Sequence, residues 1–309
     1  MEIVIEATLY TDAACPWGYS ANPAFRVLEW RYGDQLTWRL VPIGLREEVT
    51  ESYARTFDRA RSATRFEKFR SRYGMPFGRV PKERASATGR GCRAVVAARL
   101  LDPGSEWRVL RALQLAYFTT AMLLDDDDQI REALRRVPGL DADAIVDRLD
   151  DPETEAAYQR DHAEARSAAG SPAEAQGKTS TSDGPVRFTA PSLVFDRDGR
   201  RLVGGGWQPI LAYDVLLANL DPTLRRKPEP DSPMPLLEWY EDGLATAEVA
   251  ALLAVGPDYV SDFEAAENEL EELAGAGFAT RTQMGEDAVW RSAASSEPGS
   301  RTVRAAAAT

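Results

Sequence analysis

The chain has 309 residues, roughly twice the length of a typical domain, so we expect two domains or one domain enlarged by an insertion. The hydrophobic fraction of 44% and the charged fraction of 28% are ordinary for a globular protein, which excludes a disordered, collagenous or disulfide-scaffold chain. The net charge is −12, and residues 231–291 account for all of it, with 14 acids against two arginines, which indicates a separate C-terminal unit.

Several features predict a cytoplasmic location. No apolar run reaches the ~18 residues that cross a membrane, and residues 1–6 lack the basic start and apolar run of a secretory signal. The two cysteines, Cys15 and Cys92, are then expected to stay reduced. Only four of the 37 basic residues are lysine, and this preference for arginine is typical of a GC-rich genome.

The N-terminal residues predict a βαβ unit. Ile3–Tyr10 alternates and is rich in β-formers, Asn22–Tyr32 has apolar residues at helical spacing, and Leu36–Pro42 is a second strand that a proline ends. The loop of residues 11–18 follows the carboxyl end of the first strand. Active sites of α/β folds lie at this edge, so we look for chemistry in the loop.

Residues 51–184 are expected to be mainly helical, with proline and glycine stops between helices and a polar loop from Ser171. The acidic run Asp125–Asp128 suggests a metal site, but acids at a solvated helix start explain it better. His162 is the only histidine, so a Ser-His-Asp triad or a histidine-based metal site lacks parts. We therefore predict no metal.

Strand patterns return after this region. Ala190–Phe195 predicts a strand, a hairpin turn leads to a second strand that ends in three glycines, and Gln208–Asn219 predicts a helix. Residues 221–235 contain five prolines and predict a stiff linker.

Residues 236–292 predict a small winged-helix-like α+β domain of three helices and two short strands, followed by a disordered tail at 293–309. The third helix, from residue 263 to 274, has several acids and no lysine or arginine, so it would repel a polyanion. We predict no nucleic-acid partner. The apolar helix faces instead predict docking on the preceding domain or on a second copy of the chain, which would make a homodimer.

Cys15 is the clearest candidate for chemistry. It follows the first strand and starts a helix, where unpaired N–H groups and the helix dipole favour the thiolate, which is the nucleophile. Pro16 fits the first helical turn, where a missing N–H costs nothing. The alternative is a buried structural cysteine. With Trp17 beside it, the junction favours an accessible nucleophile of low pKa.

Three motifs then occur in the order found in one family. Residues 10–18, Tyr-Thr-Asp-Ala-Ala-Cys-Pro-Trp-Gly, resemble the active-site turn of the DsbA-like thioredoxin superfamily. The resemblance is closest to its FrnE-like branch, which overlaps with 2-hydroxychromene-2-carboxylate isomerases and kappa-class glutathione transferases. Residues 189–195 resemble the family's cis-proline strand, and residues 205–209, Gly-Gly-Trp-Gln-Pro, resemble its Gly-Ala-Gln-Pro helix start.

The resemblance implies an α/β, thioredoxin-like core built from residues 1–50 and 185–220, with residues 51–184 as a large helical insertion. It also implies that Pro191 is a cis-proline facing the thiol, although base rates alone favour a trans bond.

Dithiol members of the family carry a second cysteine three positions after the first, where this chain has Gly18. A mixed disulfide at Cys15 would then be resolved by an external thiol or by Cys92, which we expect to be buried.

The resemblance further implies a site for an acidic low-molecular-weight thiol. This cosubstrate would be mycothiol if the arginine preference reflects a high-GC actinobacterium, and glutathione otherwise. Its predicted contacts are residues near the glutathione site of kappa-type relatives and residues of the polar loop and cis-proline strand: Arg84, Ser86, Thr88, Arg90, Gln176, Lys178 and Ala190. Each of the polar ones is also compatible with a solvated loop.

Three functions follow from these expectations. The first is a monothiol thiol-disulfide oxidoreductase that uses Cys15 with a small thiol and a disulfide substrate. The second is a transferase- or isomerase-like enzyme in which the Cys15 thiolate adds to an electrophile without net redox. The third is a catalytically degenerate module that binds protein partners.

Overall fold

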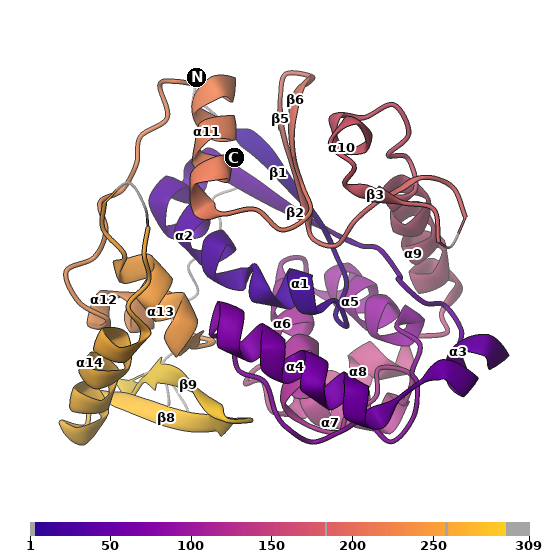
Figure 1. The fold of residues 1–309 in the computed structure, drawn as a ribbon, viewed down its shortest axis with the longest axis horizontal. Helices are drawn as coiled ribbons and strands as arrows, with labels where there is room; N and C mark the ends of the chain where they lie inside the picture. The colour runs from indigo at the N-terminus through magenta and orange to yellow at the C-terminus, as the bar shows by residue number, and fades with distance from the viewer. Residues whose placement is uncertain (1–3, 183, 257–258, 295–309) are drawn as a thin grey trace.

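The computed structural model describes residues 4–182, 184–256 and 259–294, and most of the predicted C-terminal tail lies outside this range. A four-stranded sheet with the order β2-β1-β5-β6 forms the centre of the molecule (Figure 1). β1 and β2 are parallel, whereas β5 is antiparallel to both β1 and β6. The strands are β1 (Ile5–Thr11), β2 (Leu36–Pro42), β5 (Ser192–Arg197) and β6 (Arg200–Gly205).

Helices cover both sides of this sheet. Figure 1 shows α2 (Asn22–Tyr32) and α11 (Ile210–Leu220) on one side, with α9 (Pro152–Ala165) and α10 (Pro172–Ala175) on the other. Only one residue of β1 is exposed, as expected for a strand that is covered on both faces. The short helix α1 (Pro16–Ser20) therefore starts from a rigid, buried strand end.

The insertion between β2 and β5 consists mainly of helices, as the sequence predicts. Asp126 caps α7 by accepting a hydrogen bond from the Gln129 N–H at 3.0 Å, so the acidic run at 125–128 does begin a helix. The remaining elements that precede β5 are η1 (Gly33–Gln35), α3 (Glu51–Thr56), α4 (Arg59–Tyr73), α5 (Gly89–Leu101), α6 (Ser105–Thr119), α7 (Asp127–Arg135), α8 (Ala142–Asp147), β3 (Thr179–Ser180) and β4 (Arg187–Phe188). The predicted polar loop is thus partly ordered, since α10, β3 and β4 lie in it.

The C-terminal residues form three helices and a three-stranded sheet with the order β7-β9-β8. The elements follow one another as helix, strand, helix, helix, strand, strand, which agrees with the predicted three helices and two closing strands and adds a short strand after the first helix. Its elements are α12 (Met234–Trp239), β7 (Leu244–Ala245), α13 (Thr246–Leu253), α14 (Phe263–Gly275), β8 (Ala279–Met284) and β9 (Asp287–Ser292).

This C-terminal domain packs on the preceding domain and shares a hydrophobic core with it. Its buried Leu236, Leu237 and Val249 belong to the same continuous hydrophobic core as Val27 and Leu28 of α2. Helix α13 packs along α2. The apolar faces of the acidic block are therefore covered by the preceding domain of the same chain, which is the first of the two docking possibilities raised above.

Ion pairs with the insertion involve some of the acids in this domain. Arg111 of α6 forms a bidentate pair with Glu248 of α13, with both oxygens at 2.7 Å. Arg70 pairs with Asp287 at 2.8 Å. The acids thus neutralise arginines of the insertion that would otherwise be unpaired at the contact between the domains.

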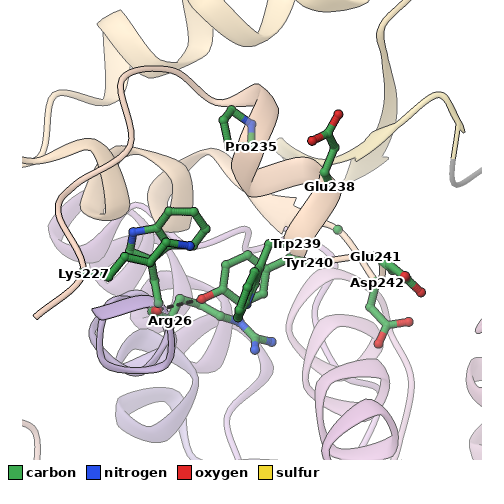
Figure 2. Close-up of a pocket in the computed structure, with 10 residues that line it drawn as sticks. Arg26, Lys227, Pro235, Glu238, Trp239, Tyr240, Glu241 and Asp242 are labelled. Atoms are coloured by element: carbon green, nitrogen blue, oxygen red, sulfur yellow. Dashed lines mark hydrogen bonds between the residues drawn. The ribbon is translucent and has the colours of Figure 1, made fainter. Parts of the chain in front are cut away.

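The linker of residues 221–235 lies against α2 rather than crossing open solvent. The Lys227 N–H donates to the Arg31 carbonyl, and the Lys227 ammonium lies 3.2 Å from the ring centre of Trp30 and 4.5 Å from that of Trp239. These residues line the cavity shown in Figure 2, whose volume is about 850 Å³. The contacts of Lys227 with Trp30, Trp239 and the Arg31 carbonyl hold the linker against α2. In the described part of the chain, no helix combines the length and the apolar character needed to cross a bilayer.

Candidate active site

The loop after β1 presents Cys15 at the start of α1. Cys15 has extended backbone angles as the N-cap residue, and Pro16 occupies the first turn, as predicted. The Cys15 N–H donates to the Asp12 carbonyl at 3.1 Å, and the Cys15 carbonyl accepts from the Tyr19 N–H at 2.9 Å. These bonds fix the cysteine between strand and helix.

Asp12 holds this loop in place, a role that sequence reasoning missed. Its buried carboxylate accepts hydrogen bonds from the N–H groups of Ala14 and Leu45 and from the Thr88 hydroxyl, at 2.8 to 2.9 Å. The signal was present in the sequence, because an aspartate that accepts from the residue two positions later is the usual first residue of an Asx turn. The carboxylate ties the cysteine loop to the ends of β2 and α5.

Pro191 faces the thiol from the other side. The Ala190–Pro191 peptide bond is cis, and the Cys15 Sγ–H donates to the Ala190 carbonyl at 3.1 Å. The Ser192 hydroxyl donates to the Thr189 carbonyl at 2.7 Å and accepts from the Gly206 N–H, which fixes the turn before β5. The structure thus brings together Cys15, Ala190 and Pro191, which are separated by about 175 residues in the sequence.

The thiol is neither accessible nor acidic, so that expectation is wrong. Cys15 is only 6% exposed, and burial raises the pKa of its thiol to about 11. The N–H groups of Gly18 and Trp17 lower the pKa, as a helix start should, but they do not offset burial. The nearby Asp12 charge raises it further. In this structure Cys15 is therefore a protonated thiol at neutral pH.

This burial has a measurable consequence. Iodoacetamide reacts with the thiolate, so the alkylation rate of the native protein should keep rising through pH 9 and reach half of its plateau only near pH 11. In denaturant the midpoint should return to the free-cysteine value of about 8.5. The measurement is done on Cys92→Ser to leave one reactive thiol. An alkylation midpoint below pH 8 in the native protein would show that the helix start lowers the pKa of Cys15 by more than burial raises it.

Aromatic side chains form a wall beside Cys15. The Trp17 ring is 39% exposed and lies edge-on to Phe69 and Tyr73 of α4, with ring centres 4.9 and 5.7 Å apart. Tyr73 in turn contacts Trp207, with ring centres 5.2 Å apart. Sequence reasoning named only Trp17, because the other three come from the insertion and from the turn after β6.

Arg65 is a second residue that the sequence did not reveal. It lies on the same face of α4, one turn before Phe69, and its charge lowers the pKa of Cys15. The Arg65 side chain is exposed and stacks on Phe69, and within the described ranges it makes no ion pair with an acid. It is thus a cation held near the thiol.

The residues predicted from the kappa-type site have partners within the chain in this structure. Ser86 and Thr88 are buried, and the Thr88 hydroxyl supports Asp12 rather than facing outward. Arg84 forms a bidentate pair with Asp125, and Arg90 pairs with Asp127 and Asp150. Carboxylates of the insertion therefore occupy the groups that were expected to receive a cosubstrate.

Gln176 and Lys178 lie much closer to the cis-proline turn. The Lys178 carbonyl accepts from the Thr189 hydroxyl at 2.9 Å. The Lys178 side chain runs past Gly205, where a Cβ would come within 2.7 Å of the Lys178 Cβ, so this approach requires glycine. Gln176 donates to the Val203 carbonyl of β6 at 3.3 Å. Both side chains are exposed, and that of Lys178 runs along Gly205 and Gly206 at the end of β6.

Cys92 is enclosed at the start of α5. It is 1% exposed, its Sγ–H points to the Asp12 carboxylate at 3.5 Å, and burial raises the pKa of its thiol well above the ordinary value. Both cysteines are free thiols. A role for Cys92 in resolving a disulfide at Cys15 would require this buried group to leave its place beside Asp12.

Comparisons with solved structures identify the same architecture. A protein from Nitrosomonas europaea with the provisional description protein disulfide isomerase has a TM-score of 0.53 and 17% identity, over 70% of this chain and 96% of that one. A probable DsbA oxidoreductase from Streptomyces coelicolor has a TM-score of 0.52 and 18% identity, over 72% and 92%. These likenesses establish the fold.

Comparison of the sequence with curated proteins gives no match. The family model for the DSBA-like thioredoxin domain matches residues 7–177, from the first strand through the helical insertion. This range is more than half of the chain and contains Cys15 and the loop that presents it. The chain therefore belongs to the DSBA-like thioredoxin domain family.

Proposed function

We propose that the protein is a monothiol disulfide oxidoreductase that acts through Cys15 with a low-molecular-weight thiol. The observation that carries the proposal is the single thiol at the start of α1, hydrogen-bonded to the carbonyl that precedes the cis-proline. Gly18 stands where a second cysteine would form a disulfide within the turn. A one-cysteine site can exchange thiols but must rely on a second molecule to complete the cycle.

The proposed cycle has two exchanges. The Cys15 thiolate attacks one sulfur of a disulfide, forms a mixed disulfide and releases the other half as a thiolate, which takes up a proton from solvent. A small thiol, as thiolate, then attacks the substrate-derived sulfur of that mixed disulfide. This step restores the Cys15 thiolate and forms a disulfide between the small thiol and that half of the substrate, which a second molecule of the small thiol reduces.

The raised pKa favours the reducing direction of this cycle. A low thiol pKa stabilises the reduced enzyme and makes it an oxidant, whereas a high pKa favours the mixed disulfide over the free thiolate and makes that thiolate more nucleophilic, although only a small fraction is ionised at neutral pH. Burial raises the pKa of Cys15 to about 11. We therefore propose reduction of small or protein-bound disulfides rather than their formation.

Two exposed cations support an anionic small thiol as cosubstrate. Arg65 lies on one side of Cys15 and Lys178 lies behind the cis-proline turn, so they could receive the carboxylates of glutathione or the polar groups of mycothiol. Arg84, Ser86 and Thr88 are not part of this proposal, since they are buried or paired with acids. We also propose a cytoplasmic location, where both free cysteines of the chain would stay reduced.

Intact-mass measurement tests the proposal. Reduced protein is incubated separately with oxidised glutathione and with oxidised mycothiol, then analysed with and without added reductant. We expect one reducible adduct on the parent and on Cys92→Ser, and none on Cys15→Ser. Absence of any adduct at Cys15 up to pH 9.5 would refute a thiol-exchange role. An adduct that persists when Cys15 is replaced would place the reactive group elsewhere.

The C-terminal domain is proposed to have no nucleic-acid partner. Most of α14 is exposed, and in the described part of the chain none of its glutamates forms an ion pair. Because binding to DNA depends on phosphate neutralisation, this face should repel a duplex even at low salt. A gel-shift titration in low-salt buffer should show no complex, and a shift at low micromolar protein would contradict the charge argument.

A further inference from the structure

A cavity of about 350 Å³ lies between the thioredoxin-like domain and the C-terminal domain. Its lining is mainly apolar and aromatic: Tyr73, Trp207, Ile210, Leu211, Tyr259 and Phe263. The first four belong to the thioredoxin-like domain and its insertion, and the last two belong to the C-terminal domain. The volume is in the range of sites that hold a single small organic group.

This cavity is connected to the candidate active site through α1 and through aromatic contacts. Ser20, at the end of the five-residue helix that Cys15 begins, lies in its wall. The Tyr73 ring contacts both the Trp17 ring and the Trp207 ring. Trp207 directly follows Gly206, whose N–H donates to Ser192 of the cis-proline turn. Figure 1 shows α1 beside α4, whose C-terminal end carries Tyr73.

Polar groups are few and placed at particular points of the wall. The Ser20 side chain is 4% exposed, and its hydroxyl has no hydrogen-bond partner among the described residues. Arg72 lies at the rim with its guanidinium 5.4 Å from the Tyr73 ring centre. Within those residues no acid forms an ion pair with Arg72. The cavity thus offers a mainly apolar interior and one cation, Arg72, in its wall.

The C-terminal domain holds its two aromatic residues in defined positions. Tyr259 has a φ of +44°, which is unfavourable for a bulky side chain, and its hydroxyl donates to Asp214 at 3.2 Å while Arg31 stacks on its ring. Phe263 lies against Gly74, where a Cβ would come within 2.8 Å of the ring. Even so, Phe263 remains 42% exposed and Leu211 49% exposed. Large apolar side chains around a concave site mark a place for a ligand.

We propose that this cavity binds the aromatic, negatively charged part of a small disulfide substrate, so that the C-terminal domain helps to select the substrate of Cys15. The inference rests on the proposed thiol exchange at Cys15. The aromatic lining and the volume fit one ring system, and Arg72 complements an anionic group on it. In the reaction, the Cys15 thiolate attacks the nearer sulfur, an aryl mixed disulfide forms, and the other aryl thiolate leaves.

Two surface positions on α11 provide a matched pair of variants. Leu211 and Val215 are 49% and 50% exposed and lie one helical turn apart, but only Leu211 lines the cavity. Leu211→Trp should fill the cavity, whereas Val215→Trp adds the same side chain outside it. Arg72→Gln removes the cation without changing the apolar lining.

Binding is measured first, without chemistry. Fluorescence titration of Cys15→Ser protein with anilinonaphthalene sulfonate, an aromatic anion, should give a saturable site. Leu211→Trp and Arg72→Gln, each in that background, should weaken its affinity at least about fivefold, and Val215→Trp should leave it unchanged. Equal affinity in all four proteins would overturn the cavity as an anion-binding aromatic site.

Kinetics then separate this inference from the proposed function. The rate of Cys15 with dithiobis(nitrobenzoate), an aromatic anionic disulfide, is compared with its rate with hydroxyethyl disulfide in Cys92→Ser protein. The ratio of the two rate constants should fall at least about fivefold in Leu211→Trp but not in Val215→Trp. Reaction with both disulfides at an unchanged ratio would refute the inference and leave thiol exchange intact. Failure of both disulfides to react would refute thiol exchange, and the fluorescence titration alone would then decide the cavity.

Discussion

Gly18→Cys, combined with Thr11→Ala, should convert the protein into a dithiol enzyme that reduces protein disulfides without an external thiol to resolve the intermediate. A Cβ at position 18 would lie 3.6 Å from the Cys15 Cβ, within the 3.5–4.5 Å that disulfides require. The same Cβ would come within 2.5 Å of the Thr11 hydroxyl, so cysteine alone would collide with that side chain. The Thr11 hydroxyl is buried and has no hydrogen-bond partner among the described residues, so Thr11→Ala removes the collision without loss of a bond.

The expected gain is large because the resolving step becomes intramolecular. Positioning the second thiol beside Cys15 replaces a bimolecular reaction, so we expect insulin reduction at least about tenfold faster than in the parent at the same reductant concentration. Thiol titration should also show one disulfide in the oxidised double variant. The control is Thr11→Ala with Gly18→Ser, which has the same shape at position 18 but no sulfur.

Two outcomes would contradict this expectation. A parent as active as the double variant would mean that another thiol already resolves the mixed disulfide, and Cys92→Ser would test that thiol directly. A double variant that forms no disulfide would mean that α1 does not hold positions 15 and 18 as described.

Local patterns were enough to predict the framework of the site. Alternation in Ile5–Thr11, helical spacing in Asn22–Tyr32 and the proline that ends Leu36–Pro42 each act within a few residues, and the structure has these elements at nearly the predicted bounds. The cysteine at the strand–helix junction follows from the same local signals. The partnership of Cys15 with Ala190 was accessible only through family resemblance, because about 175 residues separate them.

The sequence could not predict how the site is buried. The pKa of Cys15 was expected to be low because its own helix start favours the thiolate, but burial depends on neighbours that come from α4 and the cis-proline turn. Thr88 was misassigned for a related reason. A threonine before a helix has the same local pattern whether its hydroxyl faces solvent or, as here, a buried carboxylate such as Asp12.

Charge counting was also misleading when taken without contacts. Considered alone, a block with 14 acids and two arginines predicts a separate C-terminal unit. In the structure, Asp242, Glu248 and Asp287 instead face arginines of the insertion. Part of the acidic charge thus complements arginines of the same chain, and the most buried of these ion pairs should matter most for docking.

Arg111→Met should be the most destabilising single change at this contact. Arg111 and Glu248 have side chains 8% and 0% exposed, and Arg111 also donates to the Gly243 carbonyl at 2.8 Å. Removing the guanidinium leaves a buried carboxylate with Arg26 at 3.6 Å as its remaining cation. Loss of one partner of a buried pair costs several kcal/mol, so we expect a decrease of about 3 kcal/mol in the free energy of unfolding at pH 7.

The effect should depend on pH in a defined direction. Burial by itself would raise the pKa of Glu248, but the Arg111 charge and hydrogen bonds keep it below its ordinary value. The pair therefore stabilises the parent above pH ~4.3, the unfolded value, and this stabilisation is lost as pH falls through the lower folded pKa. In Arg111→Met, the effect of burial on the pKa of Glu248 is no longer offset by Arg111. Protonation of Glu248 at low pH then removes the buried charge, so the variant should recover part of its lost stability. The difference in stability between parent and variant should shrink from pH 7 toward pH 4.

Urea unfolding of three matched variants provides the measurement. Arg108→Met removes an arginine one turn away on the same helix, whose partner Asp242 is about one-third exposed, and it should cost less than about 1 kcal/mol. Arg111→Met with Glu248→Met removes both buried charges and should recover much of the lost stability, because apolar side chains can replace a buried pair at little cost. If Arg111→Met unfolds at the same urea concentration as Arg108→Met, the buried pair does not hold the C-terminal domain. Docking would then rest on the apolar packing of α13 against α2 alone.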